Sequence, residues 1–218
     1  MKLRDRLLIS LAFLCLMGFA IINFASIQNL KKHHVEEYDK YSYAYDCIME
    51  AELQYWDYKH QLVNEVQNYI TTIAPSSNLR GYAIVEECEK YNIDVCFVLA
   101  QGEIESHFGT KGIASKLNSV FNVGVYDDKT AETVDRKYRF DYANESIEPY
   151  LKLLTTKYLV NKTEEELLIK FVDINNKRYA SNPNYEAILF AKYKSISENT
   201  KIVEYHAQMK NWAIKCNR

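Results

Sequence analysis

The sequence predicts a mainly α protein of the α+β class, with one small β-hairpin as its sheet component. Apolar residues recur at helical spacing through most of the chain, and only one short stretch has strand character. The 218 residues include only 6 Gly and 3 Pro, so few positions interrupt a helix. A chain of this length accommodates an N-terminal segment and one domain of about 150 residues. The net charge of −2 argues against nucleic acid as a partner.

The N-terminus carries the features of a membrane segment. Residues 1–6 are basic and are expected in the cytoplasm, and the run from Leu7 to Ala25 has no charged residue. A run of this length spans a bilayer, which predicts a single transmembrane anchor over residues 7–26. A cleaved signal peptide, with a small-residue site at Ala25-Ser26, is the alternative. The basic flank before the first membrane segment usually sets its orientation in the membrane. The chain that follows residue 26 is therefore expected outside the cytoplasm, in the periplasm or at the cell surface.

Residues 27–60 are predicted to form a helical stalk, and residues 61–218 the functional domain. The stretch from Val35 to Ile73 contains no Gly or Pro, and its apolar residues recur near helical spacing. Pro75 is expected to end this helical region. The heptads are too irregular to predict a coiled coil.

The chain has five cysteines. Four of them lie beyond the predicted membrane segment, where disulfides can form, and the sequence leaves their pairing open. These four are Cys47, Cys88, Cys96 and Cys216. No Cys-x-x-Cys pair and no cluster of histidines occurs in the sequence, so neither a metal nor another cofactor is expected.

The strongest candidate for a functional site is the helix that begins after Asp94, a residue suited to cap it. Helical spacing puts Gln101, Gly102 and Glu105 on one side of this helix. A carboxyl beside apolar neighbours such as Phe108 is poorly solvated, which raises its pKa and suits a general acid. From the residues alone, an ordinary surface glutamate at a helix end is the alternative interpretation of Glu105.

The neighbours of Glu105 suggest how this helix would serve a ligand. Gln101 lies one turn earlier and is expected to hydrogen-bond Glu105 or a sugar. Gly102 removes a side chain, at a cost of about 1 kcal/mol relative to Ala in a helix, which suggests close approach of a substrate. Glu103 points elsewhere and is expected to be solvated.

The one stretch with strand character begins at Val120, Val123 and Val125 and resumes at Thr133 and Val134. It predicts a small β-hairpin with its turn at two aspartates. Four acidic residues on it are candidates for a second catalytic carboxylate, and most of them are expected to be solvated turn residues. These candidates are Asp127, Asp128, Glu132 and Asp135.

The remaining helices are predicted from their capping residues. One starts at Ser76-Ser77 and runs to about Tyr91, one starts at Asn144 and runs to about Leu159, one starts at the capping box Thr163–Glu166, one starts at Asn182-Pro183, and the last covers about Lys201 to Lys215. Tyr185, just inside the helix that follows Pro183, is expected to pack.

Four stretches together resemble the glucosaminidases of glycoside hydrolase family 73. The first is VLAQGEIESHFGTKGIASKLNSVFNVG, which is similar to the family pattern Ala-Gln-x-x-x-Glu-Ser-x-(Trp/Phe)-Gly…Asn-Asn-(Leu)-Phe-Gly-Ile. FDYANESIEPYLKLL and RYASNPNYEAI follow in the family's order, and the lead-in YITTIAPSS…KYNIDVCF also matches. The resemblance covers about Leu62 to Ile196.

This resemblance implies a lysozyme-like helical fold and cleavage of the peptidoglycan glycan strand at N-acetylglucosaminyl bonds. It places Glu105 at the catalytic acid and Tyr179 at a tyrosine in the cleft near that acid. Glu132 becomes the first choice for the second acid, because the family has a glutamate on this hairpin. Gln101, Phe121 and Asn122 are expected to shape the sugar site.

The sequence departs from the family pattern in three motifs. Ser119 replaces the second Asn of the Asn-Asn pair, Phe121-Asn122-Val123 replaces Phe-Gly-Ile, and Asn182 replaces Asp in the late motif. These changes bear on substrate detail more than on the fold.

Three functions are compatible with the sequence. The first is a membrane-anchored peptidoglycan hydrolase of the endo-β-N-acetylglucosaminidase type, in which either a second carboxylate activates water or the substrate's N-acetyl group attacks. The second is a lytic transglycosylase on the same fold. The third is an inactive glycan-binding or structural component of the envelope. The expected partner is the peptidoglycan glycan strand, and partners in an envelope complex or in phage lysis are not identified by the sequence.

Overall fold

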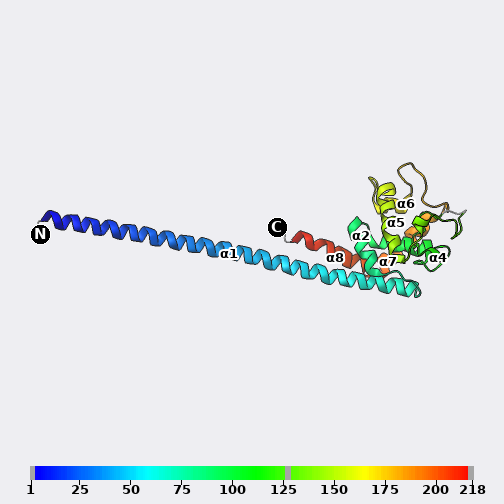
Figure 1. The fold of residues 1–218 in the computed structure, drawn as a ribbon, viewed down its shortest axis with the longest axis horizontal. Coiled ribbons are helices and arrows are strands. Elements are labelled where there is room, and N and C mark those ends of the chain that lie inside the picture. Colours follow the sequence, from blue (N-terminus) through cyan, green and yellow to red (C-terminus); the bar gives the residue numbers. More distant parts are fainter. Residues whose placement is uncertain (1–2, 126–128, 216–218) are drawn as a thin grey trace. The chain divides into compact units, whose positions relative to one another are not determined.

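The computed structural model describes the backbone of residues 3–125 and 129–215, and the side chains of residues 17–19, 21–125 and 129–211. The chain divides into two units, residues 1–53 with 216–218, and residues 54–215. Both are helical in their described parts (Figure 1). The predicted mainly helical class is therefore confirmed.

The first unit is formed by the N-terminal part of α1 (Leu3–Ile73). Many large apolar and aromatic side chains of this part are exposed, including Phe24, Tyr38 and Tyr45. Among the residues that the structure describes, no helix is both long and apolar enough to qualify as a membrane span. Much of the predicted anchor, residues 7–16 and 20, lies outside the described side chains.

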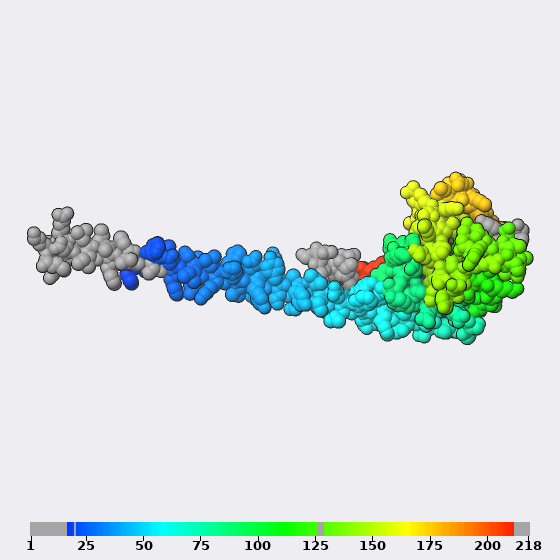
Figure 2. All heavy atoms as spheres, viewed as in Figure 1, coloured from blue at the N-terminus to red at the C-terminus, as the bar shows by residue number. Residues whose placement is uncertain are grey.

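The second unit takes its first helix from α1 beginning at Gln54 and adds a series of shorter helices (Figure 1). In chain order these are α2 (Gly81–Tyr91), α3 (Val95–Ser106), α4 (Ala114–Leu117), η1 (Arg136–Tyr138), η2 (Ala143–Ser146), α5 (Ile147–Leu153), the π-helical η3 (Leu154–Tyr158), α6 (Glu164–Ile169), α7 (Tyr185–Asn199) and α8 (Ile202–Lys215). Figure 2 shows one face of this unit, with α2, α5 and α6 at its surface.

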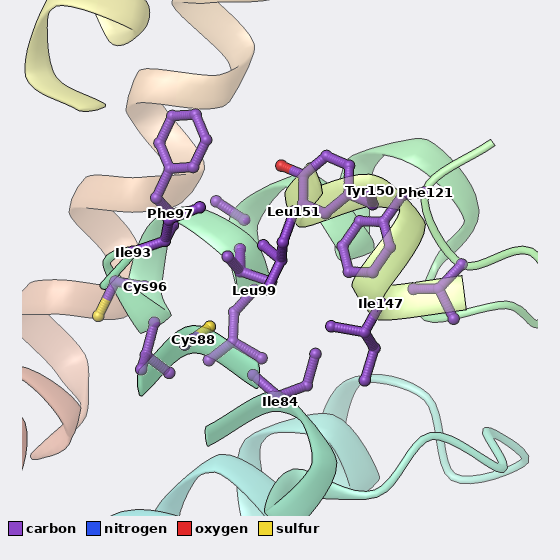
Figure 3. Packing of buried hydrophobic residues seen from close by; sticks show 14 of the residues in the cluster. Ile84, Cys88, Ile93, Cys96, Phe97, Leu99, Phe121, Ile147, Tyr150 and Leu151 are labelled. Atoms are coloured by element: carbon purple, nitrogen blue, oxygen red, sulfur yellow. The ribbon is translucent and has the colours of Figure 1, made fainter. Parts of the chain in front are cut away.

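Helix α3 is the centre of this unit, since residues 95–102 are all buried and α2, α7 and α8 pack against it. A helix that is apolar all round is typical of a core element. In the core, Ile84 of α2, Leu99 of α3 and Ile147 of α5 meet (Figure 3). The apolar spacing of α3 thus serves packing on all sides, and Glu105 emerges only at its C-terminal end.

A buried lysine joins α1 to α2. Lys59 is only 5% exposed, and its ammonium bonds Glu86, Glu89 at 2.8 Å and the Tyr55 hydroxyl at 3.3 Å. These partners outweigh the desolvation of the ammonium and raise the pKa of Lys59. A buried charge is tolerated only when it is paired in this way.

Several predicted helix boundaries are confirmed. The Asp94 carboxylate caps α3 by accepting from the Phe97 N–H at 2.9 Å, and Thr163 and Glu166 form the predicted capping box of α6. Helix α1 ends at Ile73, two residues before Pro75. These boundaries were accessible from the sequence because each depends on a local side chain.

Other boundaries differ from the prediction. The second helix starts at Gly81 rather than near Ser77, whose hydroxyl instead donates to the Phe108 carbonyl at 2.6 Å. Helix α7 starts at Tyr185, and Asn182 accepts from the Asn184 N–H at 2.9 Å in the turn before it. The predicted helix over 144–159 is divided among η2, α5 and η3.

The prediction of a β-hairpin in the stretch that begins at Val120 is wrong for the residues of that stretch that the structure describes. They form turns and η1, and the described chain contains only an isolated bridge, between Val172 and Arg178. Local bonds compete with a ladder here: the Thr133 hydroxyl accepts from the Thr130 N–H at 2.8 Å, as threonine does in turns. Of the valines expected on strands, Val125 and Val134 instead contribute to a small cluster with Leu117. Val120 and Val123 belong to the main core.

The cysteine pattern is partly resolved. Cys47 is disulfide-bonded, whereas Cys88 and Cys96 are buried free thiols. Burial raises the pKa of both thiols. These two cysteines therefore act as small apolar core residues.

Candidate active site

Glu105 lies in the last turn of α3, where the helix ends in a tight left-handed turn. His107 and Phe108 both have positive φ, 53° and 54°. Their N–H groups donate to the carbonyls of Glu103 at 2.8 Å and Gly102 at 3.0 Å, and these two bonds close the end of the helix. The chain reverses directly after Glu105 and leaves this residue half-buried.

Two side chains hydrogen-bond the Glu105 carboxyl among the residues described. The Tyr185 hydroxyl, at the start of α7, donates to Oε1. The Asn122 amide donates to Oε2 at 3.4 Å and, more closely, to the Glu105 backbone carbonyl at 2.6 Å. Asn122 thereby also caps a carbonyl that the end of α3 leaves without a helical partner.

The environment of Glu105 favours its protonated form. Burial raises the pKa of its carboxyl above the ordinary value of 4.5, and the hydrogen bonds from Tyr185 and Asn122 only partly oppose this rise. Desolvation disfavours the charged form of a carboxyl. Glu105 therefore holds its proton to a higher pH than a solvated glutamate, as a general acid requires.

Tyr185 is itself supported by buried groups. The Gln101 amide nitrogen donates to its hydroxyl oxygen at 2.7 Å, and the Gln101 carbonyl oxygen accepts from the Tyr150 hydroxyl. Gln101 and Tyr150 are both 0% exposed. Gln101 thus lies behind Tyr185, where it does not reach the surface of the site.

The position of Phe121 explains Gly102. Phe121 is 1% exposed and stacks on Tyr150, with ring centroids 4.0 Å apart and an angle of 7° between planes (Figure 3). A Cβ on Gly102 would lie 3.2 Å from the Phe108 ring and 3.3 Å from the Phe121 ring. The interpretation that Gly102 admits a substrate is therefore wrong, because these two rings fill the space beside it.

Two buried serines fix the segment that carries Asn122. The Ser106 hydroxyl donates to the Val120 carbonyl at 2.6 Å and accepts from the Gly109 N–H at 2.7 Å. On the other side, the Ser146 hydroxyl accepts from the Val120 N–H at 3.1 Å. The serine after Glu105 thus has a structural role: it holds the chain at the distance at which Asn122 reaches the carboxyl.

Tyr179 lies in the segment before α7, on the aromatic side of the site. Its ring stacks on Phe171 with centroids 4.4 Å apart and lies 5.6 Å from the ring of Tyr185. Its hydroxyl donates to the Phe121 carbonyl at 3.4 Å, a long hydrogen bond. Burial, with a smaller contribution from Glu105, raises its pKa well above 10, so Tyr179 stays neutral.

Comparison with known proteins agrees with this geometry. Residues 81–201 match the glucosaminidase family, described as Mannosyl-glycoprotein endo-beta-N-acetylglucosaminidase. The chain belongs to this family. The matched region runs from the start of α2 to just past α7 and includes Glu105, Asn122 and Tyr179. No curated protein matches the chain.

Two of the four candidate second acids, Glu132 and Asp135, take no part in the contacts just described. Glu132 is exposed, and a hydrogen bond with Thr130 is the main influence lowering the pKa of its carboxyl. Asp135 caps η1 by accepting from the Lys137 N–H at 3.1 Å. Asp127 and Asp128 lie outside the described residues. Among described contacts, none joins Glu132 or Asp135 to Glu105.

Glu103 is a structural residue of the glucosaminidase domain. Its carboxylate pairs with Lys192 of α7 at 2.5 Å and accepts from the Tyr69 hydroxyl of α1 at 2.5 Å. It is half-buried, so the expectation that it is solvated is wrong. The structure also has no group of three or more His, Cys, Asp or Glu side chains placed to hold a metal ion, within its described part.

Sequence reasoning did not identify Tyr185 and Tyr150 as parts of the site. Tyr185 was expected only to pack, and it does pack near Phe171 and Tyr179, but its hydroxyl also bonds Glu105. Both tyrosines occur in stretches that resemble the family, RYASNPNYEAI and FDYANESIEPYLKLL. That resemblance was the available signal, because helical spacing alone cannot distinguish a packing tyrosine from one that also bonds an acid.

Proposed function

We propose that this glucosaminidase hydrolyses β-1,4 bonds of the peptidoglycan glycan as an endo-β-N-acetylglucosaminidase, with Glu105 as the general acid. Membership of the family supports glycoside hydrolysis at the family level. The observation that carries the residue assignment is the Glu105 carboxyl itself, which is half-buried, hydrogen-bonded by Tyr185 and raised in pKa by burial.

In the proposed reaction, Glu105 transfers its proton to the glycosidic oxygen as the bond between C1 and that oxygen breaks. The bonding electrons go to the leaving oxygen, which departs as a hydroxyl, and positive charge develops at C1. A water molecule activated by Glu132 attacks C1 in one version, which needs the two carboxyls about 6.5–9.5 Å apart. In the other, the N-acetyl oxygen of the substrate attacks C1 first and water then opens the resulting ring.

The other site residues receive roles that follow from their positions. In this proposal Asn122, whose amide donates to the Glu105 carboxyl, contacts the bound sugar. Tyr179, which is neutral and half-buried beside Tyr185, orients the N-acetyl group in the same proposal. Phe121 shapes the site from behind through its carbonyl and ring, and Gln101 acts on the site through Tyr185.

A polar hollow of about 210 Å³ borders the turn that follows Glu105, and Phe108 and Gly109 of that turn line it. The rest of its lining is rich in uncharged hydroxyl and amide side chains, those of Ser76, Asn78, Thr110, Ser115 and Asn118. Groups of this kind suit a neutral sugar, which offers hydroxyls and an amide. We assign this hollow to binding part of the glycan strand.

The substrate also determines where the domain must act. Peptidoglycan lies outside the cytoplasmic membrane, so we infer that residues 54–215 work outside the cytoplasm. Digestion of intact spheroplasts by an external protease tests this inference. Loss of the domain under these conditions supports it, and full protection of the domain, with a cytoplasmic marker also intact, contradicts it.

The catalytic assignment is tested by Glu105→Gln on purified peptidoglycan. Glutamine keeps the shape and can accept from Tyr185 but has no acidic proton to transfer, so clearing of the wall suspension should slow by at least about 100-fold. Glu103→Gln is the matched control, since it makes the same exchange two residues earlier in α3, and it should retain clearing. Equal clearing by Glu105→Gln and the unchanged chain would refute the role of Glu105.

A further inference from the structure

Buried hydrogen bonds connect Tyr150 to Glu105 across three helices. The Tyr150 hydroxyl of α5 donates to Oε1 of Gln101 on α3, and Nε2 of Gln101 donates to the Tyr185 hydroxyl oxygen at 2.7 Å. Tyr185 of α7 then donates to Oε1 of Glu105. Tyr150 and Gln101 are 0% exposed and Tyr185 is 8% exposed, so water does not readily replace any link.

Tyr150, at the buried end of this series, determines which group donates in each hydrogen bond. Burial raises the pKa of Tyr150 well above 10, so its hydroxyl stays protonated and needs an acceptor. The Gln101 carbonyl is the acceptor that it contacts, which turns the Gln101 NH₂ toward Tyr185. The described contacts of the Tyr185 hydroxyl are Gln101 and Glu105. Because Gln101 presents a donor to it, the Tyr185 hydrogen must point at Glu105.

We propose that Tyr150 and Gln101 are positioning residues that, through Tyr185, keep Oε1 of Glu105 an acceptor and so place the acid's proton on Oε2. A protonated carboxyl can carry its hydrogen on either oxygen, and only one of the two can serve the glycosidic bond. With Oε1 accepting from Tyr185, Oε2 carries the hydrogen and donates it. The Asn122 contact to Oε2 is long, at 3.4 Å, and a protonated carboxyl oxygen can still accept it. This inference rests on the proposed role of Glu105 as the general acid.

The hydrogen bond from Tyr185 is a principal influence on the titration of Glu105, because the side chains that face its carboxyl are uncharged. Tyr185 faces it from α7, Tyr150 from α5, Tyr179 from the segment before α7, and Asn122 from the segment after α4. The three tyrosines are held neutral by burial and asparagine does not ionise. Burial raises the Glu105 pKa, and the bonds from Tyr185 and Asn122 lower it.

The test is an NMR titration of the Glu105 side-chain carboxyl in the full chain, labelled with carbon-13 and assigned by its loss in Glu105→Gln. Tyr185→Phe removes the donor to Oε1 and should raise the Glu105 pKa by about 1–2 units, since a hydrogen bond to a charged group contributes about 1.5–3 kcal/mol. Gln101→Met and Tyr150→Phe should raise it by less, because they only loosen the orientation of Tyr185. In the Tyr185→Phe background, neither should shift it further.

Tyr69→Phe is the matched control, because it removes a tyrosine hydroxyl that donates to Glu103 on the same helix. It should leave the Glu105 titration unchanged. If the Gln101 amide were reversed, Tyr185 would donate to Gln101 and accept from protonated Glu105, and Tyr185→Phe would lower the pKa or leave it unchanged. That result overturns the proposal.

Two safeguards keep the test decisive. Should Tyr185→Phe fail to melt cooperatively, Tyr150→Phe and Gln101→Met in the unchanged background still decide by the sign of their shifts: a rise supports the proposal and its absence contradicts it. The peptidoglycan-clearing assay detects failure of the general-acid assignment independently of the NMR titration. In that case Glu105→Gln would clear peptidoglycan at the same rate as the unchanged chain.

Discussion

Glu105 is shielded from water by its surroundings, yet its carboxyl is hydrogen-bonded by two donors. The first property raises its pKa and the second lowers it, and burial is the larger influence. A residue arranged in this way is suited to proton donation but weakens the fold once it ionises. Functional groups often carry such a cost in stability.

This cost predicts how Glu105→Gln changes stability with pH. A carboxyl whose pKa is raised in the folded state contributes its full stability below the unfolded value near 4.5 and loses it as the pH rises through the folded pKa. The variant should therefore melt near the unchanged chain at pH 4 and about 2–4 °C higher at pH 7, for a difference of about 1 kcal/mol. Calorimetric melts at a series of pH values check this. A variant that melts lower than the unchanged chain at pH 7 would contradict it.

Single residues also show what the sequence can and cannot predict. Glu105 could be selected as a candidate from the sequence, because a carboxyl at the end of an apolar helix in a family-like stretch is distinctive, and its catalytic role stays a prediction. Gly102 and Gln101 were misread in part, since helical spacing places residues on a side but does not say what covers that side. The rings of Phe108 and Phe121 cover Gly102, and both come from outside its helix.

At the scale of elements, the site depends on α3 being held by its neighbours. Helices α2, α7 and α8 pack against α3, and α2 in turn approaches α1 very closely at Gly81. A Cβ built on Gly81 would lie 2.7 Å from the Gln67 backbone nitrogen and 2.9 Å from the Val63 carbonyl oxygen. The Gly81 N–H also donates to the Gln67 side chain at 2.8 Å.

Gly81→Ala should therefore destabilise the domain by about 1–3 kcal/mol, because backbone atoms cannot move aside as side chains do. Gly102→Ala is the matched comparison: its neighbours at 3.2–3.3 Å are side-chain rings, and Ala gains about 1 kcal/mol in helix propensity. Chemical denaturation should show the larger loss at Gly81. The reverse order, or no loss at Gly81, would mean that α1 and α2 are not in such close contact.

Elements defined by local chemistry were predictable, and those defined by distant packing were not. The caps at Asp94 and Thr163 depend on a side chain three residues from its partner. The stretch predicted as a hairpin has valines near alternate positions, but Val134 packs with Leu117, and Arg139 bonds the carbonyls of Glu132 and Val134. Tertiary contacts override strand propensity in such a segment.

At the scale of the molecule, the site is assembled from parts far apart in the chain. Glu105 lies in the last turn of α3, and Asn122 follows α4. Tyr179 lies before α7, and Tyr185 begins that helix. The mainly helical class and the order of most helices followed from composition and spacing. The network of Tyr150, Gln101, Tyr185 and Glu105 did not, because its bonds span separations of 49, 84 and 80 residues.

Hydrolysis of the glycan with Glu105 as the acid leaves characteristic ends on the glycan strand, and these can be identified. Purified peptidoglycan is digested by the full chain, reduced with borohydride and analysed by mass spectrometry, with the Glu105→Gln variant in parallel. We expect new N-acetylglucosaminitol ends from the unchanged chain and none above background from the variant. Anhydro-sugar ends, new N-acetylmuramitol ends, or equal release by the variant would contradict this expectation.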